Sequence, residues 1–430
     1  MSKSLLNIQR SKRLPVLLLL GLLTAPLAGA ETLQQAWDVA LSVNHSLKAV
    51  GETTAAAALQ LEAAKAAQLP GLSVEAGYTA LDNAPETKTN FGQFPVGEKN
   101  NLSYKALVTL PLYTSGRINS SINAADAALR ASRTQQSSKI QDLKLKVAKA
   151  FVAVLRTTGG LEVANSHVAS LKAHARDVEN IHKQGMVSRN DLLAAQVSLA
   201  DAEHEAIRAE NILDITKSAF NRLMGRALNQ IVVLDEILPK SFAEPLEILT
   251  SQALKQRHEL LAQQDQIRAV RHQAASIRAE TGPQVALSGG YGYQENQYQV
   301  HEGQWSVNLR AQWKLFDGGV IRNKASATER QAAALQEQYD DLVSNITLQV
   351  RQYWLDVQET RKRIRVTEKA ITQAEENLKV NRDLYENGLS TNTEVLDAET
   401  LRTRSQNNHS NAIYDAVLAT LNLKRAMGEL

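Results

Sequence analysis

The sequence predicts a mainly α fold with a β-barrel portion, in which long helices and four strands are arranged as two repeats. Three observations support this prediction: an internal duplication, two long segments free of proline, and four short segments that alternate apolar with polar residues. The 430-residue chain is 43% hydrophobic and contains no cysteine. A disulfide framework, a thiolate metal site and a cysteine nucleophile are therefore excluded.

The first thirty residues have the pattern of a secretory signal peptide. A basic start is followed by the apolar run Leu14–Leu23 and by small residues that end at Ala30. We predict cleavage between Ala30 and Glu31. An uncleaved membrane anchor is the alternative, but this apolar run is short for a helix that spans a bilayer.

The positive charge of the chain is concentrated in this leader. The whole chain carries a formal charge of +3, and its first thirty residues contain four basic and no acidic side chains, which leaves −1 for residues 31–430. A nearly neutral chain argues against a nucleic-acid partner, because nucleic-acid binders present a net basic surface.

The remaining chain is a duplication. Short motifs recur at a nearly constant distance: Ala40–Leu47 with Ala253–Leu260, Leu112 with Leu315, and Met224-Gly225 with Met427-Gly428. The offset is 213 residues for the first pair and 203 for the other two, so one length change of ten residues separates them. We assign residues 31–245 to a first repeat and 246–430 to a second, and we expect the two repeats to form one domain.

The proline-free segments predict long helices. They are rich in strong helix formers, and proline would break a helix interior. Gly185 and Gly388 suit the left-handed residue that ends a helix, while Gly159-Gly160 is expected to bend or break the first long helix. The predicted helices cover residues 33–69, 117–184 and 188–225 in the first repeat, and 247–281, 320–387 and 391–428 in the second.

Four segments of alternating apolar and polar residues predict two β-hairpins, 72–110 and 285–313. Each segment is about nine residues long, which is the length of a tilted strand that crosses a bilayer. A half-buried sheet in a soluble protein shows the same alternation, but the signal peptide favours a membrane strand. Because four strands cannot close a barrel and a membrane sheet tolerates no open edge, several chains must share one barrel.

The turn after each long helix carries the most specific motif. It reads Tyr385-x-x-Gly388-Leu389 and then Glu394-Val395-Leu396-Asp397-Ala398 in the second repeat, and Gly185-Met186 and then Asp191-Leu192-Leu193 in the first. Together with the duplication, the long helices and one strand pair per repeat, this motif resembles the TolC family of outer-membrane efflux and secretion channels. The resemblance covers about the whole chain after the leader.

The resemblance implies a homotrimer with a twelve-stranded outer-membrane β-barrel and a hollow tunnel of twelve helices across the periplasm of a Gram-negative bacterium. It implies a passive exit duct for a tripartite efflux or type I secretion system, which works with a periplasmic adaptor (membrane fusion) protein and an inner-membrane pump. The barrel would contact outer-membrane lipid. The cargo (drug, metal ion or secreted protein) and the class of pump stay open.

The sequence departs from the family pattern at three places. Family members often have proline after the positions of Asn44 and Arg257, where this chain has histidine, so we expect a changed helix start in both repeats. Ser390 stands where several relatives have a basic residue that helps to hold the entrance shut. The closing network must therefore differ, and Arg189 is a candidate for it.

The resemblance implies a periplasmic entrance formed by Asp191, Tyr385, Ser390, Glu394 and Asp397. Threefold symmetry would turn each acid into a ring of carboxylates, and such rings favour cations. Asp191 and Glu394 also follow a Ser or Thr by three residues, so helix capping is an alternative role that can coexist with the first. Asp397 lies beyond the capping position and matches an entrance acid of the family, while Tyr385 matches a gate tyrosine.

The resemblance also implies that the turns at Gly185-Met186 and Gly388-Leu389 dock the helical hairpin of the adaptor. A glycine C-cap with a hydrophobic contact is the simpler interpretation of both turns. The sequence shows no enzyme motif, and none of the nine histidines forms an H-x-x-x-H pair, so we expect no catalytic, cofactor or metal site. A soluble periplasmic coiled-coil scaffold or adaptor is the alternative function.

Overall fold

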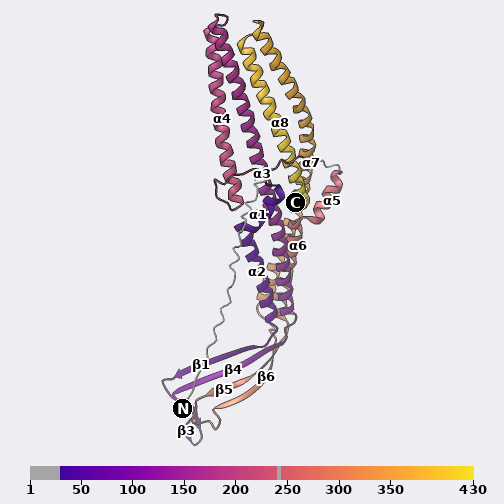
Figure 1. Cartoon of the computed structure of the whole chain (residues 1–430). Helices are drawn as coiled ribbons and strands as arrows, with labels where there is room; N and C mark the ends of the chain where they lie inside the picture. Colours follow the sequence, from indigo (N-terminus) through magenta and orange to yellow (C-terminus); the bar gives the residue numbers. More distant parts are fainter. Residues whose placement is uncertain (1–29, 240–243) are drawn as a thin grey trace, which may run out of the picture.

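The computed structural model describes residues 30–239 and 244–430, and the predicted leader up to residue 29 lies outside them. The described chain is elongated, with the tips of the long helices at one end and a β-sheet at the other (Figure 1). The first repeat contains α1 (Leu33–Val43), α2 (His45–Ala66), β1 (Gly71–Ala80), β2 (Glu86–Thr89), β3 (Gly92–Pro95), β4 (Asn100–Tyr113), α3 (Arg117–Lys183) and α4 (Arg189–Leu223). The second contains α5 (Leu246–Gln256), α6 (His258–Arg278), η1 (Ala279–Thr281), β5 (Gln284–Gln294), β6 (Gly303–Gln312), α7 (Val320–Glu386) and α8 (Asn392–Met427).

The two long helices agree closely with the sequence prediction. Helices α3 and α7 each run for 67 residues, and α7 begins at Val320, 203 residues after α3 begins at Arg117. Of the bend or break predicted at Gly159-Gly160, a break is wrong, because α3 continues through both glycines, whereas a bend stays a prediction. A Cβ atom at Gly159 would lie 3.3 Å from the Ser410 Oγ atom, so this glycine allows α8 to approach α3 closely.

The shorter helices are divided where the sequence predicted single ones at 33–69 and 247–281. Asn44 leaves the helical region with φ −67° and ψ 114°, and its side chain accepts a hydrogen bond of 3.0 Å from the Leu47 backbone, which starts α2. Arg257 has the same extended backbone conformation, with φ −60° and ψ 117°. The interruptions lie directly before His45 and His258, which stand where the family often has proline, and each histidine is the first residue of its helix.

The sheet has the strand order β1-β4-β5-β6, and all its neighbouring strands are antiparallel. The sequence did not predict the small hairpin β2–β3, which lies in the connection between β1 and β4. The length change of ten residues between the repeats falls in the same stretch. The second repeat joins β5 to β6 by a shorter connection, from Gln294 to Gly303.

The register of the sheet separates two faces. One row of paired residues crosses all four strands on the apolar face and contains Val74, Ala106, Tyr291 and Trp305. The next row, displaced by one residue, lies on the polar face and contains Glu75, Lys105, Gly292 and Gln304. The alternation predicted from the sequence is therefore consistent across the sheet, because successive side chains of a strand point to opposite faces.

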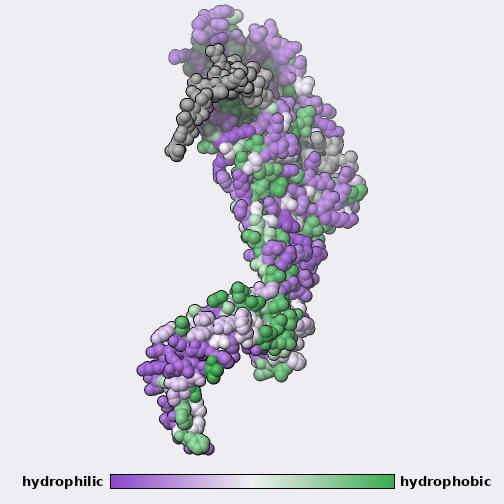
Figure 2. All heavy atoms as spheres, turned by 60° about the horizontal axis from the view of Figure 1, so that its bottom comes forward, coloured by the Kyte–Doolittle hydropathy of each residue, from purple (hydrophilic) through white to green (hydrophobic). Residues whose placement is uncertain are grey.

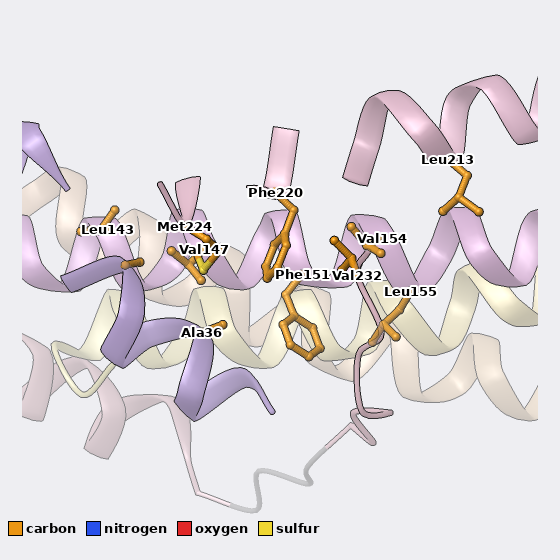
Figure 3. Close-up of a cluster of buried hydrophobic side chains, with 11 residues drawn as sticks. Ala36, Leu143, Val147, Phe151, Val154, Leu155, Leu213, Phe220, Met224 and Val232 are labelled. Carbon is orange, nitrogen blue, oxygen red and sulfur yellow. The ribbon is translucent and has the colours of Figure 1, made fainter. Parts of the chain in front are cut away.

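A hydrophobic core holds the first repeat together midway along the molecule. It joins α1, α3, α4 and the segment after α4 (Figure 3). Phe151 and Phe220 pack edge to face at its centre, with ring centroids 6.0 Å apart and an interplanar angle of 78°. Both are fully buried, and burial of such a side chain contributes about 1.5–3 kcal/mol. A second cluster around Leu260 and Ile346 joins α5, α6, α7 and α8 in the same way.

The surface of the helical column is mainly polar, but exposed apolar residues such as Ile207 on α4 and Val366 on α7 lie along it. Figure 2 shows a mainly hydrophilic column in this view, with hydrophobic residues gathered where the helices meet the sheet. Among the residues that the structure describes, none of the helices combines the length and apolar character needed to span a membrane.

Candidate functional site

The candidate site lies at the tips of the long helices, where two turns end α3 and α7. Gly185 and Gly388 adopt left-handed backbone conformations with φ 76° and 71°. The backbone N–H of Met186 donates to the Ile181 carbonyl, and each glycine N–H donates to the carbonyl three residues earlier. This pattern is a Schellman motif, as the glycine C-caps predicted, and it closes both long helices in the same way.

The apolar residue after each glycine is exposed rather than packed against its own helix. The exposed fraction is 71% for Met186 and 75% for Leu389. The simpler interpretation of the turns included a hydrophobic contact, and the exposure shows that this contact is slight. Each tip therefore presents one large apolar side chain to solvent.

The returning helices begin with capping boxes, as the sequence predicted. The Ser188 hydroxyl accepts from the Asp191 backbone, while the Asp191 carboxylate accepts from the Ser188 backbone at 3.1 Å. Thr391 and Glu394 form the equivalent box at the start of α8. Hydrogen bonds from the Ser390 hydroxyl and then the Thr391 backbone lower the pKa of the Glu394 carboxyl, so the carboxylate is favoured near a helix N-terminus.

The predicted entrance acids have different surroundings. Glu394 and Asp397 are exposed and three residues apart on α8, so they share a helix face. Asp191 is half-buried, and its backbone carbonyl accepts a hydrogen bond from the Asn392 side chain. Ser390 is also half-buried, and its hydroxyl donates a hydrogen bond to the Glu394 carboxylate.

Tyr385 is buried inside the tip. Its exposed fraction is 9%, and its hydroxyl has no hydrogen-bond partner among the described residues. Burial, and then the negative charge of Asp191, raise the pKa of this phenol. The ring lies 5.6 Å from the His174 ring, and the His174 Nε2 atom is 2.7 Å from the Asn392 side-chain oxygen.

Sequence reasoning missed His174 and Asn392. Both are buried and polar, and together they join α3 to the start of α8. The spacing of the histidines predicts no metal site, and a lone polar residue on a helix gives no signal that it is buried. The structure thus brings Tyr385, Asp191 and Asn392 together, while Asp397 points outward one turn further along α8.

Comparison with known proteins identifies the family. The family model described as outer membrane efflux protein matches residues 36–226 and 249–429, which is most of the chain. The chain belongs to this family. Its members are transport proteins of the outer membrane, and the outer membrane is the location of this chain.

The relatives of this outer membrane efflux protein have low sequence identity to it, but most of the matches cover most of both chains. It is 26% identical to outer membrane protein TolC of Vibrio cholerae over 93% of the chain and 91% of the relative. It is 25% identical to the alkaline protease secretion protein AprF of Pseudomonas aeruginosa over 68% of the chain and 63% of the relative. The CusC structure gives a TM-score of 0.83 at 17% identity, with 92% of each chain covered.

Other solved structures agree on the fold of this efflux protein. The outer membrane protein VceC of Vibrio cholerae gives a TM-score of 0.81 at 19% identity, covering 92% of this chain and 96% of that one. The fold of mainly long helices with a four-stranded sheet is therefore that of known outer-membrane channels.

Glu31, at the start of the described residues, is held against the segment after α4. The Glu31 carboxylate accepts two hydrogen bonds from the Arg226 guanidinium, of 2.7 and 2.8 Å. The Glu31 backbone N–H donates to the Val233 carbonyl at 2.9 Å.

Proposed function

We propose that this efflux protein is the outer-membrane exit duct of a tripartite efflux or type I secretion system. It conducts cargo passively from an inner-membrane pump and a periplasmic adaptor to the exterior. The observation that carries the proposal is the four-stranded sheet with one apolar and one polar face, joined directly to helices of 67 residues. Such a helix spans about 100 Å at 1.5 Å per residue, a length suited to a tunnel through the periplasm.

We propose a homotrimer with a twelve-stranded barrel. Strands β1 and β6 are the two edges of the sheet, and they run in opposite directions because three antiparallel pairings separate them. An edge β1 of one copy can therefore continue the antiparallel order beside β6 of the next. Three copies close twelve strands, with the apolar face toward outer-membrane lipid and the polar face toward the lumen.

We propose that the helix tips form the periplasmic entrance. Its residues would be Asp191, Tyr385, Ser390, Glu394 and Asp397, and threefold symmetry would arrange the exposed Asp397 side chains as a ring. The exposed Met186 and Leu389 support docking of an adaptor at the same tips. Burial of an apolar side chain by a partner is favourable, because it removes apolar surface from water.

The remaining proposals concern processing and chemistry. Residues 1–30 act as a signal peptide that is cleaved between Ala30 and Glu31, and the two repeats form one domain. The protein is not an enzyme, and it needs no cofactor or metal. The names of the relatives include protease secretion proteins and an efflux protein, so secretion and efflux both remain candidate cargo routes.

Fractionation and electrical recording test the proposed function. The mature protein should sediment with outer membranes and should run as a heat-modifiable trimer on denaturing gels. The purified trimer should also produce current steps in a planar bilayer. A monomer in the soluble periplasmic fraction, with no current steps, would support the alternative of a soluble coiled-coil scaffold.

A further inference from the structure

Strands β1 and β6 form the two edges of the sheet, and neither edge has a neighbouring strand among the residues that the structure describes (Figure 1). The residues of β1 are all exposed, as are those of β6 after Gly303. An open edge presents unpaired backbone N–H and C=O groups, so it needs a partner strand in a membrane barrel. A second copy of this chain supplies such a strand, and the duplication indicates which residues of the two edges lie opposite each other.

The strand register follows the two offsets of the duplication. Gly71 of β1 is paired with Thr109 of β4 in the first repeat. In the second repeat Gln284 of β5 is paired with Gln312 of β6. The first partners of these pairs are 213 residues apart and the second partners 203, which are the offsets of the sequence motifs. All ten pairs of the first hairpin correspond to pairs of the second in this way, so the repeats are equivalent residue by residue within the sheet.

The contact between β4 and β5 inside the chain is therefore a template for the contact between copies. At the offsets of 203 and 213 residues, β4 corresponds to β6 and β5 corresponds to β1. Leu107 of β4 is paired with Gly290 of β5. The equivalent pair at the boundary between two copies is Arg310 of β6 with Gly77 of β1 in the neighbouring copy. A slip by one residue would place the apolar side chains of one strand on the polar face, so the competing registers differ from this one by two residues.

A pair of equivalent glycines supports this register. Gly290 lies so close to β4 that a Cβ atom at this position would overlap the Ala106 carbonyl oxygen, so only glycine fits there. Its counterpart Gly77 is under no such restriction inside the chain. A Cβ atom at Gly77 would meet only the Ser103 Oγ atom, at the ordinary contact distance of 3.4 Å. The close approach of β6 from the neighbouring copy gives Gly77 the same role that Gly290 has inside the chain.

Opposite charges also come together in this register. Glu75 of β1 is paired with Lys105 of β4 on the polar face of the same chain. Arg310 is exposed on the polar face of β6, and it forms no ion pair with another residue that the structure describes. Glu75 of the neighbouring copy would be two residues away from the position opposite Arg310. Such diagonal neighbours lie about 7–8 Å apart, which is within reach of a long side chain, and Gly77 leaves the space beside Arg310 open.

We infer that β6 of each copy pairs with β1 of the next in this register, and that Arg310 forms an ion pair with Glu75 of the neighbouring copy. The inference rests on the proposed trimer. Each Glu75 carboxylate then lies between two cations, the Lys105 ammonium of its own chain and the Arg310 guanidinium of the neighbouring chain. The same pairing at every boundary between copies closes the barrel in one register.

Engineered disulfides test the register, because the chain has no cysteine of its own. The register places Asn308 opposite Thr79 of the neighbouring copy, as the counterpart of Lys105 opposite Gly292 inside the chain. After oxidation, the variant Asn308→Cys, Thr79→Cys should run as a covalent trimer on denaturing gels, and reduction should return it to monomers. The variant Lys105→Cys, Gly292→Cys is the matched control, and its disulfide should close inside each chain without covalent trimers.

Two further cysteine pairs detect a slipped register. Thr79→Cys with Ser306→Cys reports a slip of two residues in one direction, and Thr79→Cys with Arg310→Cys reports a slip in the other. In the inferred register both pairs are diagonal, beyond the Cβ separation of about 3.5–4.5 Å that a disulfide needs, so both variants should stay monomeric on denaturing gels. Covalent trimers from a slipped pair would overturn the register, and so would their absence from all three pairs.

Dissociation of the purified trimer in detergent tests the ion pair. Arg310→Gln should raise the dissociation rate about tenfold, because one pair is lost at every boundary, and 1 M NaCl should narrow the difference by screening the charges. In a Glu75→Gln background, Arg310→Gln should have little further effect. Arg278→Gln is the matched control, since Arg278 pairs with Glu329 of its own chain, and its rate should stay within about twofold of the wild type. Equal acceleration by Arg310→Gln and Arg278→Gln, or additive effects of Arg310→Gln and Glu75→Gln, would contradict the ion pair.

Substitution of the glycine gives an independent measurement of the close approach. Gly77→Ala should lower the yield of trimers about tenfold, because the added methyl group collides with β6 of the neighbouring copy. Gly292→Ala is the control on the same face, since a Cβ atom there would meet only the Lys105 Cγ atom, at 4.0 Å, and its trimers should form as in the wild type. A wild-type yield of trimers from Gly77→Ala would contradict the close approach.

These outcomes separate the register from the proposed function. Outer-membrane trimers that conduct current, but that form no disulfide between positions 308 and 79, would confirm the exit duct and overturn the register. A soluble monomer that gives no current steps would overturn both.

Discussion

A partly buried ion cluster around Glu259 allows a quantitative prediction of stability. Glu259, in the first turn of α6, accepts hydrogen bonds from Arg425 of α8, from Ser138 of α3 at 3.0 Å, and from Arg257 at 3.1 Å. Its side chain is 24% exposed, and that of Arg425 is 9% exposed. The cluster fixes the end of α8 against α3 and α6, and Glu259→Gln removes its central charge.

The size of the effect follows from the pKa of Glu259. Burial would raise this pKa, but hydrogen bonds and charges of Arg425 and Arg257 lower it from 4.5 to about 2. This difference corresponds to about 3 kcal/mol of stability at pH 7. Because the pKa of the folded state is lowered, the contribution is complete above about pH 5 and is lost as the pH falls toward 2.

Thermal unfolding of the purified trimer, followed by circular dichroism, measures the effect. The variant Glu259→Gln should unfold about 4 °C lower than the wild type at pH 7, given about 2.1 cal/mol/K of unfolding entropy per residue. The difference between the two proteins should shrink as the pH falls below 4 and should be small at pH 2.5. Glu329→Gln is the matched control, because Glu329 pairs with Arg278 in solvent and should lose less than about 1 kcal/mol. An equal loss for Glu259→Gln and Glu329→Gln, or a loss independent of pH, would refute the reasoning.

Three further predictions concern the barrel, the entrance and the tips. Leu309→Arg should prevent assembly in the outer membrane, because an arginine on the apolar face costs about 2–4 kcal/mol. Asn308→Arg, on the polar face, should still assemble. Equal behaviour of the two variants in a fractionation assay would contradict the two-faced sheet. Asp397→Ala should weaken the cation selectivity of single-channel currents, and the double variant with Glu394→Ala should lose most of it. Unchanged reversal potentials in the double variant would leave helix capping as the role of Glu394. Leu389→Asp should abolish export while trimers persist, and full export would remove the adaptor claim.

Much of the architecture was predictable because it depends on local rules. Alternating strands, long proline-free helices and glycine C-caps each follow from residue types within a few positions. The two capping boxes were also predictable, since Ser188 and Thr391 precede their acids by three residues. The entrance candidates Tyr385 and Asp397 came from the resemblance of the turn motif to the TolC family, and their arrangement around a threefold axis is a proposal.

The remaining features depend on contacts between distant segments. Gly159 and Gly160 suggest a break in isolation, but packing of α8 against this surface keeps α3 helical. No sequence pattern indicates that Glu399 is buried, and only the fold places Ser170 and Arg382 around it. The β2–β3 hairpin contains little apolar alternation, so the length change between the repeats was its only signal.

The two repeats share a backbone but differ in the chemistry of their contacts. Arg425 is buried in its ion cluster, whereas its counterpart Arg222 is exposed; Glu399 is buried, whereas Gln196 is exposed. Helix α8 therefore has buried ionic residues at two positions where its counterpart α4 has exposed residues. The offset of 203 residues predicts the same backbone for both repeats, and the structure confirms it for α3 and α7. It does not predict which of two matched side chains is buried, because burial depends on the helices that pack around each position.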